Sequence, residues 1–166
     1  MKELEVKILE IDKEIIISKL QSLGATKTFE GQIIADFFIN DEWKKIRLRK
    51  KDNRNIITYK IKQHNESINQ NIEYETNFDN HENMIEILKN IGFRKYWNSS
   101  KYRISYSLWK INFDLDKYEN IPRLVEIEAQ NMNDVKKWVK ILWYNMDKTS
   151  TLTEWKLKEF YNKNCN

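Results

Sequence analysis

Charged side chains that could bind metal and phosphate open this 166-residue chain. Glu3, Glu5 and Lys7 alternate with apolar residues in the stretch MKELEVKIL. A period of two is typical of a β-strand with one apolar and one charged face. Carboxylates on such a face can hold a divalent cation, and an amine can bind phosphate oxygens.

The same spacing, charge-x-charge, recurs in six later segments, and each segment tends to one sign. An antiparallel sheet commonly exposes one polar face, so any single strand is explained by a solvated face. Separate acidic and basic stripes argue against that explanation, because a solvated surface mixes signs locally. The basic units are Arg47 and Arg49, Lys60 and Lys62, and Lys101 and Arg103; the acidic units are Glu73 and Glu75, Asp114 and Asp116, and Glu126 and Glu128.

Alternating and helical patterns together predict about eight strands with helices inserted among them. Mostly successive strands imply an antiparallel sheet, and closure into a barrel would remove its edges. We therefore expect an α+β fold, a closed eight-stranded antiparallel β-barrel with helices packed on the outside. The strands are expected at 2–9, 27–40, 44–51, 55–63, 70–78, 93–107, 109–117 and 123–130, and the helices at 12–25, 80–92, 133–146 and 151–163.

The helices need an apolar surface to cover, which decides how the strands face. Asp12 and Asn133 are expected N-caps, and Trp138 and Trp143 are expected to pack in the third helix. If the apolar strand faces point outward to the helices, the charged faces line a hydrated tunnel. Opposite signs facing one another would offset the cost of burying isolated charges, which is several kcal/mol each.

The composition places the chain among globular proteins. Hydrophobic residues are 40 % and aromatic residues 13 % of the chain, and 29 basic against 25 acidic residues give a net charge of +4. The charges are interspersed, which disfavours nucleic acid as a partner. A single cysteine, Cys165, and the absence of a signal-like or membrane-spanning segment lead us to expect a cytoplasmic protein without membrane contact. We expect one domain over residues 1–166, with C-terminal helices at 132–163 packing on or plugging the barrel, in a monomer or homodimer.

The ordered series of charged units resembles the CYTH superfamily, the triphosphate tunnel metalloenzymes. The resemblance covers roughly residues 3–130. In the stretch QIIADFF, Asp36 also resembles an Asp-x-Tyr-Phe segment of that family. The matching units are, in order, Glu3-x-Glu5-x-Lys7, Arg47-x-Arg49, Thr58-x-Lys60, Glu73-x-Glu75, Lys101-x-Arg103, Asp116 and Glu126-x-Glu128.

The resemblance implies a tunnel that binds a triphosphate together with Mg2+ or Mn2+. The small-molecule partner would be ATP, thiamine triphosphate or tripolyphosphate. By the same resemblance, Glu5, Lys7 and Arg103 would act in catalysis. The implied metal ligands are Glu3, Glu5, Asp116, Glu126 and Glu128, and the implied substrate-binding residues are Lys7, Arg47, Arg49, Lys60, Lys62, Glu75, Lys101 and Arg103.

Metal-dependent hydrolysis of the triphosphate is the leading hypothesis, because paired carboxylates and cations suit phosphoryl transfer. The rival enzyme would be a class IV-type adenylyl cyclase, which needs the same tunnel. A non-catalytic module that binds polyphosphate or nucleotides is a third alternative. A nucleic-acid-binding barrel that stacks bases on Trp43, Trp97 and Trp109 is a fourth.

Overall fold

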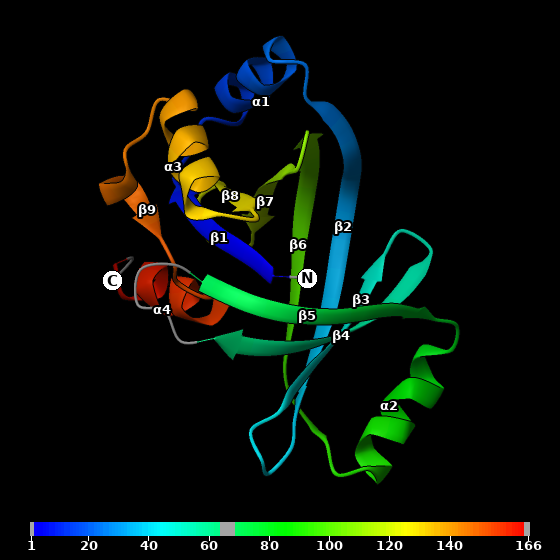
Figure 1. The fold of residues 1–166 in the computed structure, drawn as a ribbon. Helices are drawn as coiled ribbons and strands as arrows, with labels where there is room; N and C mark the ends of the chain where they lie inside the picture. The colour runs from blue at the N-terminus through cyan, green and yellow to red at the C-terminus, as the bar shows by residue number, and fades with distance from the viewer. Residues whose placement is uncertain (1, 64–68, 165–166) are drawn as a thin grey trace.

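The structure is a computed structural model. It describes the backbone of residues 2–63 and 69–164 and the side chains of residues 4–61 and 72–162. This part of the chain forms nine strands and four α-helices (Figure 1). The strands are β1 (Lys2–Leu9), β2 (Thr26–Ile39), β3 (Lys45–Lys51), β4 (Arg54–Gln63), β5 (Asn69–Phe78), β6 (Arg94–Leu108), β7 (Ile111–Tyr118), β8 (Leu124–Ala129) and β9 (Thr149–Ser150). The helices are α1 (Lys13–Ser22), α2 (His81–Asn90), α3 (Met132–Ile141) and α4 (Glu154–Asn164), with a 3-10 turn at Met146–Lys148.

All nine strands belong to one antiparallel sheet. Their order is β5-β4-β3-β2-β6-β7-β8-β1-β9. The expected α+β class with a large antiparallel sheet is therefore confirmed. The eight long strands match the eight predicted segments, whereas β9 was not predicted, because two residues are too few to show a period.

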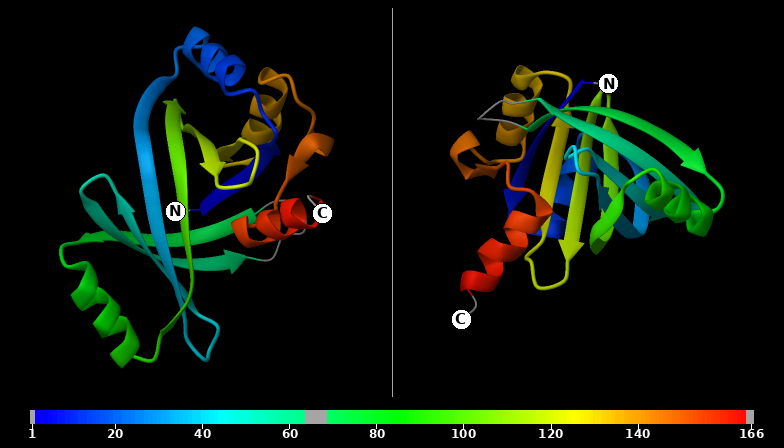
Figure 2. Two further views of the ribbon diagram at one scale, coloured as in Figure 1. Left: turned by 180° about the vertical axis from the view of Figure 1, so that it is seen from behind. Right: turned by 90° about the horizontal axis from the view of Figure 1, so that it is seen from below.

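Strand β1 joins distant parts of the sheet. Along one edge it pairs with β8 over six residues, from Leu4 to Leu9. Along the other edge it pairs first with β5, over the four residues from Lys2 to Glu5, and then with β9 at Lys7 and Ile8. The sheet is thus strongly curved, as the views in Figure 2 show. Complete closure of an eight-stranded barrel stays a prediction.

The apolar faces of β1, β6, β7 and β8 pack against α1 and α3. Val6 of β1, Phe113 of β7 and Ile127 of β8 are fully buried in this core, together with Leu20 of α1 and Trp138 of α3. Figure 1 shows the two helices on this side of the sheet, with α2 far from them. The apolar faces therefore point outward to the helices, as the sequence predicted.

Side-chain caps define where two of these helices begin. Asp12 caps α1, because its Oδ1 accepts a hydrogen bond from the backbone N–H of Ile15 (3.0 Å). The N-cap of α3 is Asn131, whose Oδ1 accepts from the backbone N–H of Asp134 (2.9 Å). The expected cap at Asn133 is wrong by two residues, since Asn131 has the extended backbone that a cap requires and Asn133 lies inside the first turn.

Helix α3 ends at Ile141, five residues before the predicted end. Trp143 follows with φ of 67°, in the left-handed region, and its side chain is 63 % exposed. The prediction that Trp143 packs in the core is therefore wrong, because the chain leaves the helix before reaching it. Trp138 is 2 % exposed and packs edge-on against Phe113, so its prediction is confirmed.

Helices α2 and α4 cover other parts of the sheet. Leu88 of α2 is buried with Phe38 and Leu48, on the outer face of β2 and β3. Leu157 of α4 is buried with Leu124 of β8. Leu124 lies two residues before Glu126 on the same strand, so the two side chains share one face of the sheet. Helix α4 thus lies at one end of the face opposite to α3. In the part of the chain that the structure describes, no helix is long and apolar enough to cross a membrane.

Candidate functional site

The charged face of the sheet lies inside the molecule. We use this name for the face of β1, β6, β7 and β8 opposite to α1 and α3. Antiparallel register sets Lys7 beside Glu126 and Arg103 beside Asp116. Asp116 is 0 %, Lys7 4 % and Arg103 9 % exposed, although all three are charged types that normally lie at the surface. The strands therefore hold opposite charges against one another away from solvent.

Lys7 neutralises two carboxylates. Its Nζ contacts Oε1 of Glu5 and lies 3.2 Å from Oε1 of Glu126. Burial lowers the pKa of Lys7, but the negative charges of Glu126 and Glu5 outweigh burial and raise it above its usual value. The ammonium therefore stays protonated and forms ion pairs with both carboxylates.

Arg103 gathers three carboxylates around one guanidinium group. Its Nε donates to Oδ1 of Asp116 (2.6 Å) and its Nη2 to Oδ2 of Asp116 (2.6 Å). Nη2 also donates to Oε2 of Glu126 (2.5 Å), and Nη1 donates to Asp114. Burial would lower the pKa of Arg103, but these carboxylates raise it. Burial would raise the pKa of Glu126, but Lys7, Lys101 and Arg103 hold it well below its usual value.

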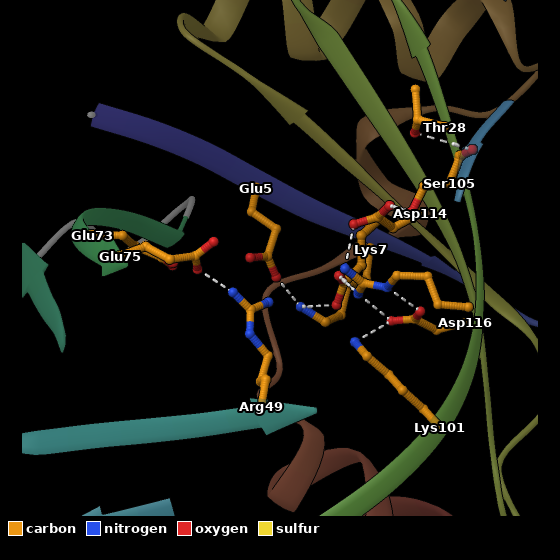
Figure 3. A network of polar contacts seen from close by, with 12 residues as sticks. Glu5, Lys7, Thr28, Arg49, Glu73, Glu75, Lys101, Ser105, Asp114 and Asp116 are labelled. Carbon is orange, nitrogen blue, oxygen red and sulfur yellow. Dashed lines mark hydrogen bonds and ion pairs between the residues drawn. The ribbon is translucent and has the colours of Figure 1, made fainter. Parts of the chain in front are cut away.

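Further hydrogen bonds fix the neighbouring carboxylates (Figure 3). Lys101 Nζ donates to Oδ2 of Asp116 (2.6 Å) and to the hydroxyl of Tyr118 (3.1 Å). Ser105 Oγ donates to Oδ1 of Asp114 (2.6 Å). These contacts join β1, β6, β7 and β8 into one set of ion pairs, which we call the central network. It consists of Glu5, Lys7, Lys101, Arg103, Asp114, Asp116 and Glu126.

A second group, the arginine cluster, lies on β3, β4 and β5. Arg49 contacts Glu75, and its Nη2 donates to Oγ1 of Thr58 (3.3 Å). Lys60 Nζ lies 2.6 Å from Oε1 of Glu73. The cluster consists of Arg47, Arg49, Thr58, Lys60, Glu73 and Glu75. It is more exposed than the central network, and it holds more cations than carboxylates.

Two guanidinium nitrogens in the arginine cluster have unmet hydrogen-bonding capacity. The Nε atoms of Arg47 and Arg49 are buried, and neither has a hydrogen-bond partner among the described residues. Burial, together with the charge of Arg47, lowers the pKa of Arg49 to about 10. Buried donors without partners are rare in proteins, and an oxyanion would satisfy them. The cluster is therefore suited to bind an anion with several oxygen atoms.

The predicted site residues separate into these two groups. The central network holds three predicted carboxylates and three predicted cations, Glu5, Asp116, Glu126, Lys7, Lys101 and Arg103, and the arginine cluster holds Arg47, Arg49, Lys60 and Glu75. Glu128 lies opposite Glu5 in the register of β1 and β8. Glu3 and Lys62 belong to β1 and β4 by their backbone, but their side chains lie outside the described part of the structure. The catalytic, substrate-binding and metal-binding roles of all these residues stay predictions.

Several residues in or beside the central network were not among the predicted site residues. Asp114 belongs to a predicted acidic unit but was given no role. Ser105 and Tyr118 lie two residues from Arg103 and Asp116 on the same strands, so the period of two could have found them. Glu154 of α4 could not have been found in this way. Burial raises its pKa, against the opposing charges of Lys101 and Lys158. Its position near β6 depends on how α4 folds back, which no local pattern shows.

Asp36 lies on the other face of the sheet. Its carboxylate is 2.7 Å from Lys95 Nζ and 3.4 Å from Nε2 of His81, at the start of α2. Asp36 and His81 also line a cavity of about 450 Å³ beside α2. Asp36 therefore contacts neither the central network nor the arginine cluster, although its segment belongs to the family resemblance.

The carboxylates of the central network fit a hard divalent cation in their chemistry. Oxygen donors suit Mg2+ and Mn2+, and Glu5, Glu126 and Glu128 lie on neighbouring positions of β1 and β8. Among the described residues, however, no group of three or more acidic, histidine or cysteine side chains is arranged to hold a metal ion. Lys7 and Arg103 contact oxygens of Glu5, Glu126 and Asp116.

Comparisons with known proteins agree with the fold. The family model named CYTH domain matches residues 1–161. "Putative adenylate cyclase MJ0240" of Methanocaldococcus jannaschii is 27 % identical over 150 residues, which cover 86 % of this chain and 84 % of that protein. The solved structure of PH1012 from Pyrococcus horikoshii OT3 has a TM-score of 0.80 and 26 % identity, with 93 % of this chain and 98 % of that chain covered.

A protein from Hippeastrum shares the same fold at lower identity. This protein, HpAC1 from Hippeastrum, has a TM-score of 0.62 and 13 % identity, with 93 % of this chain and 92 % of that chain covered. It is described as a "Putative adenylyl cyclase" that "reveals a dominant triphophatase activity".

Proposed function

The chain belongs to the CYTH family, and on that premise we propose that it hydrolyses a triphosphate bound between the arginine cluster and the central network with the help of Mg2+ or Mn2+. The observation that carries this proposal is the pair of buried Nε atoms on Arg47 and Arg49. They face no partner in the described part of the chain, and they belong to the cluster in which cations outnumber carboxylates. A triphosphate offers the oxygen acceptors and the negative charge that this cluster lacks.

The proposal includes a tunnel that encloses the substrate. The pairing of β1 with both β5 and β8, and the burial of Asp116, Lys7 and Arg103, support such an enclosure. Exclusion of water strengthens every ionic contact inside it. A tunnel would also explain how so many charged side chains lie away from bulk solvent without being surrounded by apolar side chains.

Each group of residues has its own task in this mechanism. Arg47, Arg49 and Lys60 bind and orient the phosphate oxygens. The oxygen of a water molecule attacks the terminal phosphorus, and the bond from that phosphorus to its bridging oxygen breaks. The carboxylate of Glu5 accepts the proton of the attacking water. Orthophosphate and the remaining diphosphate leave.

A divalent cation held by Glu5, Glu126 and Glu128 would neutralise phosphate charge and make water more acidic. Developing negative charge on the departing diphosphate would be stabilised by Lys7 and Lys101. The family resemblance assigned Arg103 to catalysis as well. Its bonds to three carboxylates instead support a role in holding the acidic residues in place.

A second candidate is cyclisation of ATP to cyclic AMP with release of pyrophosphate. The name of the relative that is 27 % identical, "Putative adenylate cyclase MJ0240", favours this candidate. Both reactions use the same bound triphosphate, but they differ in the phosphorus that is attacked and therefore in the products.

The products separate the candidates. We would incubate the full chain with tripolyphosphate, ATP and thiamine triphosphate in Mg2+ or Mn2+, and measure orthophosphate, pyrophosphate and cyclic AMP. Orthophosphate release that is lost in Glu126→Gln supports hydrolysis. Glu86→Gln, at an exposed position of α2, is the matched control and should leave the rate unchanged. Pyrophosphate with cyclic AMP would identify a cyclase, and the absence of every product would contradict both enzymes.

A further inference from the structure

Lys7 occupies the carboxylates that a divalent cation would need. We propose that Lys7 is an exchangeable internal counter-ion, which must transfer from Glu5 and Glu126 to the triphosphate before a cation can bind there. The cation and the triphosphate would then bind cooperatively, each promoting the binding of the other. This inference rests on the proposed function, since it takes a triphosphate as the ligand.

The position of Lys7 makes it unfavourable for a metal cation alone to replace its ammonium at Glu5 and Glu126. Its Nζ contacts Glu5 and lies 3.2 Å from Glu126, and the residue is 4 % exposed. A cation that displaced the ammonium from both carboxylates would leave a buried charge without a partner. Breaking a buried ion pair in this way is strongly unfavourable, because it leaves an uncompensated buried charge. The cation alone should therefore bind weakly.

A triphosphate removes this obstacle because it brings new acceptors. In the view of Figure 3, Glu5 projects between Arg49 and the Lys7–Asp116 side of the central network. A triphosphate bound to the arginine cluster would carry negative oxygens to this boundary. The flexible stem of Lys7 would let its ammonium turn from the carboxylates to those oxygens. Glu5 and Glu126 would then be free to ligate the cation.

Arg103 does not share this property. It makes four hydrogen bonds to three carboxylates, including two to Asp116. A planar guanidinium group held on several sides exchanges its partners less readily than an ammonium with two contacts. The two cations therefore divide the work, with Arg103 fixing the carboxylates and Lys7 leaving them when the ligand arrives.

Titration of Mn2+ tests the proposal without measuring turnover. Free Mn2+ is followed by electron paramagnetic resonance, with and without a non-hydrolysable imido analogue of tripolyphosphate. For the unchanged chain, we expect the analogue to raise the Mn2+ affinity by about 5–150-fold, the usual range of coupling between sites. Mn2+ must raise the affinity of the analogue by the same factor, and calorimetry measures this reciprocal effect.

Two matched variants assign the coupling to Lys7. Lys7→Met should bind Mn2+ alone more tightly than the unchanged chain, because Glu5 and Glu126 lose their counter-ion, and its coupling factor should fall toward one. Lys60→Met removes a cation from the arginine cluster, where Lys60 pairs with Glu73. It should weaken binding of the analogue but leave the affinity for Mn2+ alone unchanged.

Either of two results would overturn the proposal: the unchanged chain shows no coupling, or folded Lys7→Met binds Mn2+ no more tightly. The first needs no variant, so it decides the matter even if Lys7→Met does not fold in a thermal melt. Hydrolysis is measured separately by phosphate release. Coupling without hydrolysis would refute the proposed function alone, and hydrolysis without coupling would refute the role of Lys7 alone.

Discussion

Arg103 and Asp116 form a bidentate pair at the centre of the charged face. Nε and Nη2 of the arginine each lie 2.6 Å from a different oxygen of the carboxylate, and Asp116 is 0 % exposed. Two parallel hydrogen bonds fix both the distance and the plane of the pair. Because Arg103 also reaches Asp114 and Glu126, the position of this one guanidinium group sets the positions of three carboxylates.

Loss of Arg103 should strongly destabilise the fold. Arg103→Met leaves buried carboxylates without their main counter-ion, and we expect the free energy of unfolding to fall by about 3–5 kcal/mol. Urea unfolding followed by circular dichroism measures the change. Arg94→Met is the control, because Arg94 forms an exposed pair with Asp41, and such pairs contribute about 0–1 kcal/mol. Equal losses in the two variants would contradict the central role of Arg103.

The charge of Glu126 should make the protein acid-sensitive. Burial would raise the pKa of Glu126, but Lys7, Lys101 and Arg103 lower it well below the usual value of 4.5. A lowered folded-state pKa contributes stability that is present above 4.5 and is lost as the pH falls below it. We expect the Tm to fall as the pH is lowered from 5, and Glu126→Gln to show a shallower fall over this range. A Tm profile of the same slope in both proteins would refute this assignment.

Glu154 should have the opposite effect on stability. Burial raises its pKa, and Lys101 and Lys158 offset burial only in part. A raised folded-state pKa of an acid means that stability falls as the pH rises from 4.5 through the folded value. At pH 7, Glu154→Gln should therefore raise the Tm, and about 1 kcal/mol corresponds to about 2–4 °C in a chain of this size.

An exposed glutamate of the same helix provides the control for Glu154. Glu159→Gln changes the same charge on α4, and it should leave the Tm nearly unchanged. A lower Tm in Glu154→Gln at pH 7 would show that its contacts with Lys101 and Lys158 outweigh its burial.

Arg49 should contribute to substrate binding more than to stability. Arg49→Met removes one of the two unmet guanidinium donors, and hydrogen bonds to charged groups contribute about 1.5–3 kcal/mol. We therefore expect the KM for a triphosphate to rise by about 10–100-fold while kcat changes less. Initial rates of phosphate release over a range of substrate concentrations give both constants. Arg54→Met, at the exposed start of β4, should leave the KM unchanged, and an equal rise there would indicate a general loss of charge.

The sequence could predict which side chains share a face, because the period of two is a local property. Lys7, Arg103 and Asp116 lie on the charged face as their alternation predicted, and their apolar neighbours face α1 and α3. The pairing of Lys7 with Glu126 could not be predicted. It depends on the register between β1 and β8, which are separated by more than one hundred residues.

The errors of the sequence analysis have the same origin. Trp143 continues the helical period of α3, but the chain turns at φ of 67° and exposes it. Glu154 reaches the charged face only because α4 folds back against β8. Both outcomes are decided by tertiary packing, which overrides local pattern.

The neighbours of β1 have a consequence for how the protein is made. Strand β1 pairs with β8 and β9, whose residues are synthesised more than a hundred positions after its own. Contacts so distant along the chain slow folding. Until Ser150 has emerged, the nascent chain displays strand edges of the kind that aggregate or recruit chaperones. A polypeptide terminated before β8 would contain only β5 as a partner for β1.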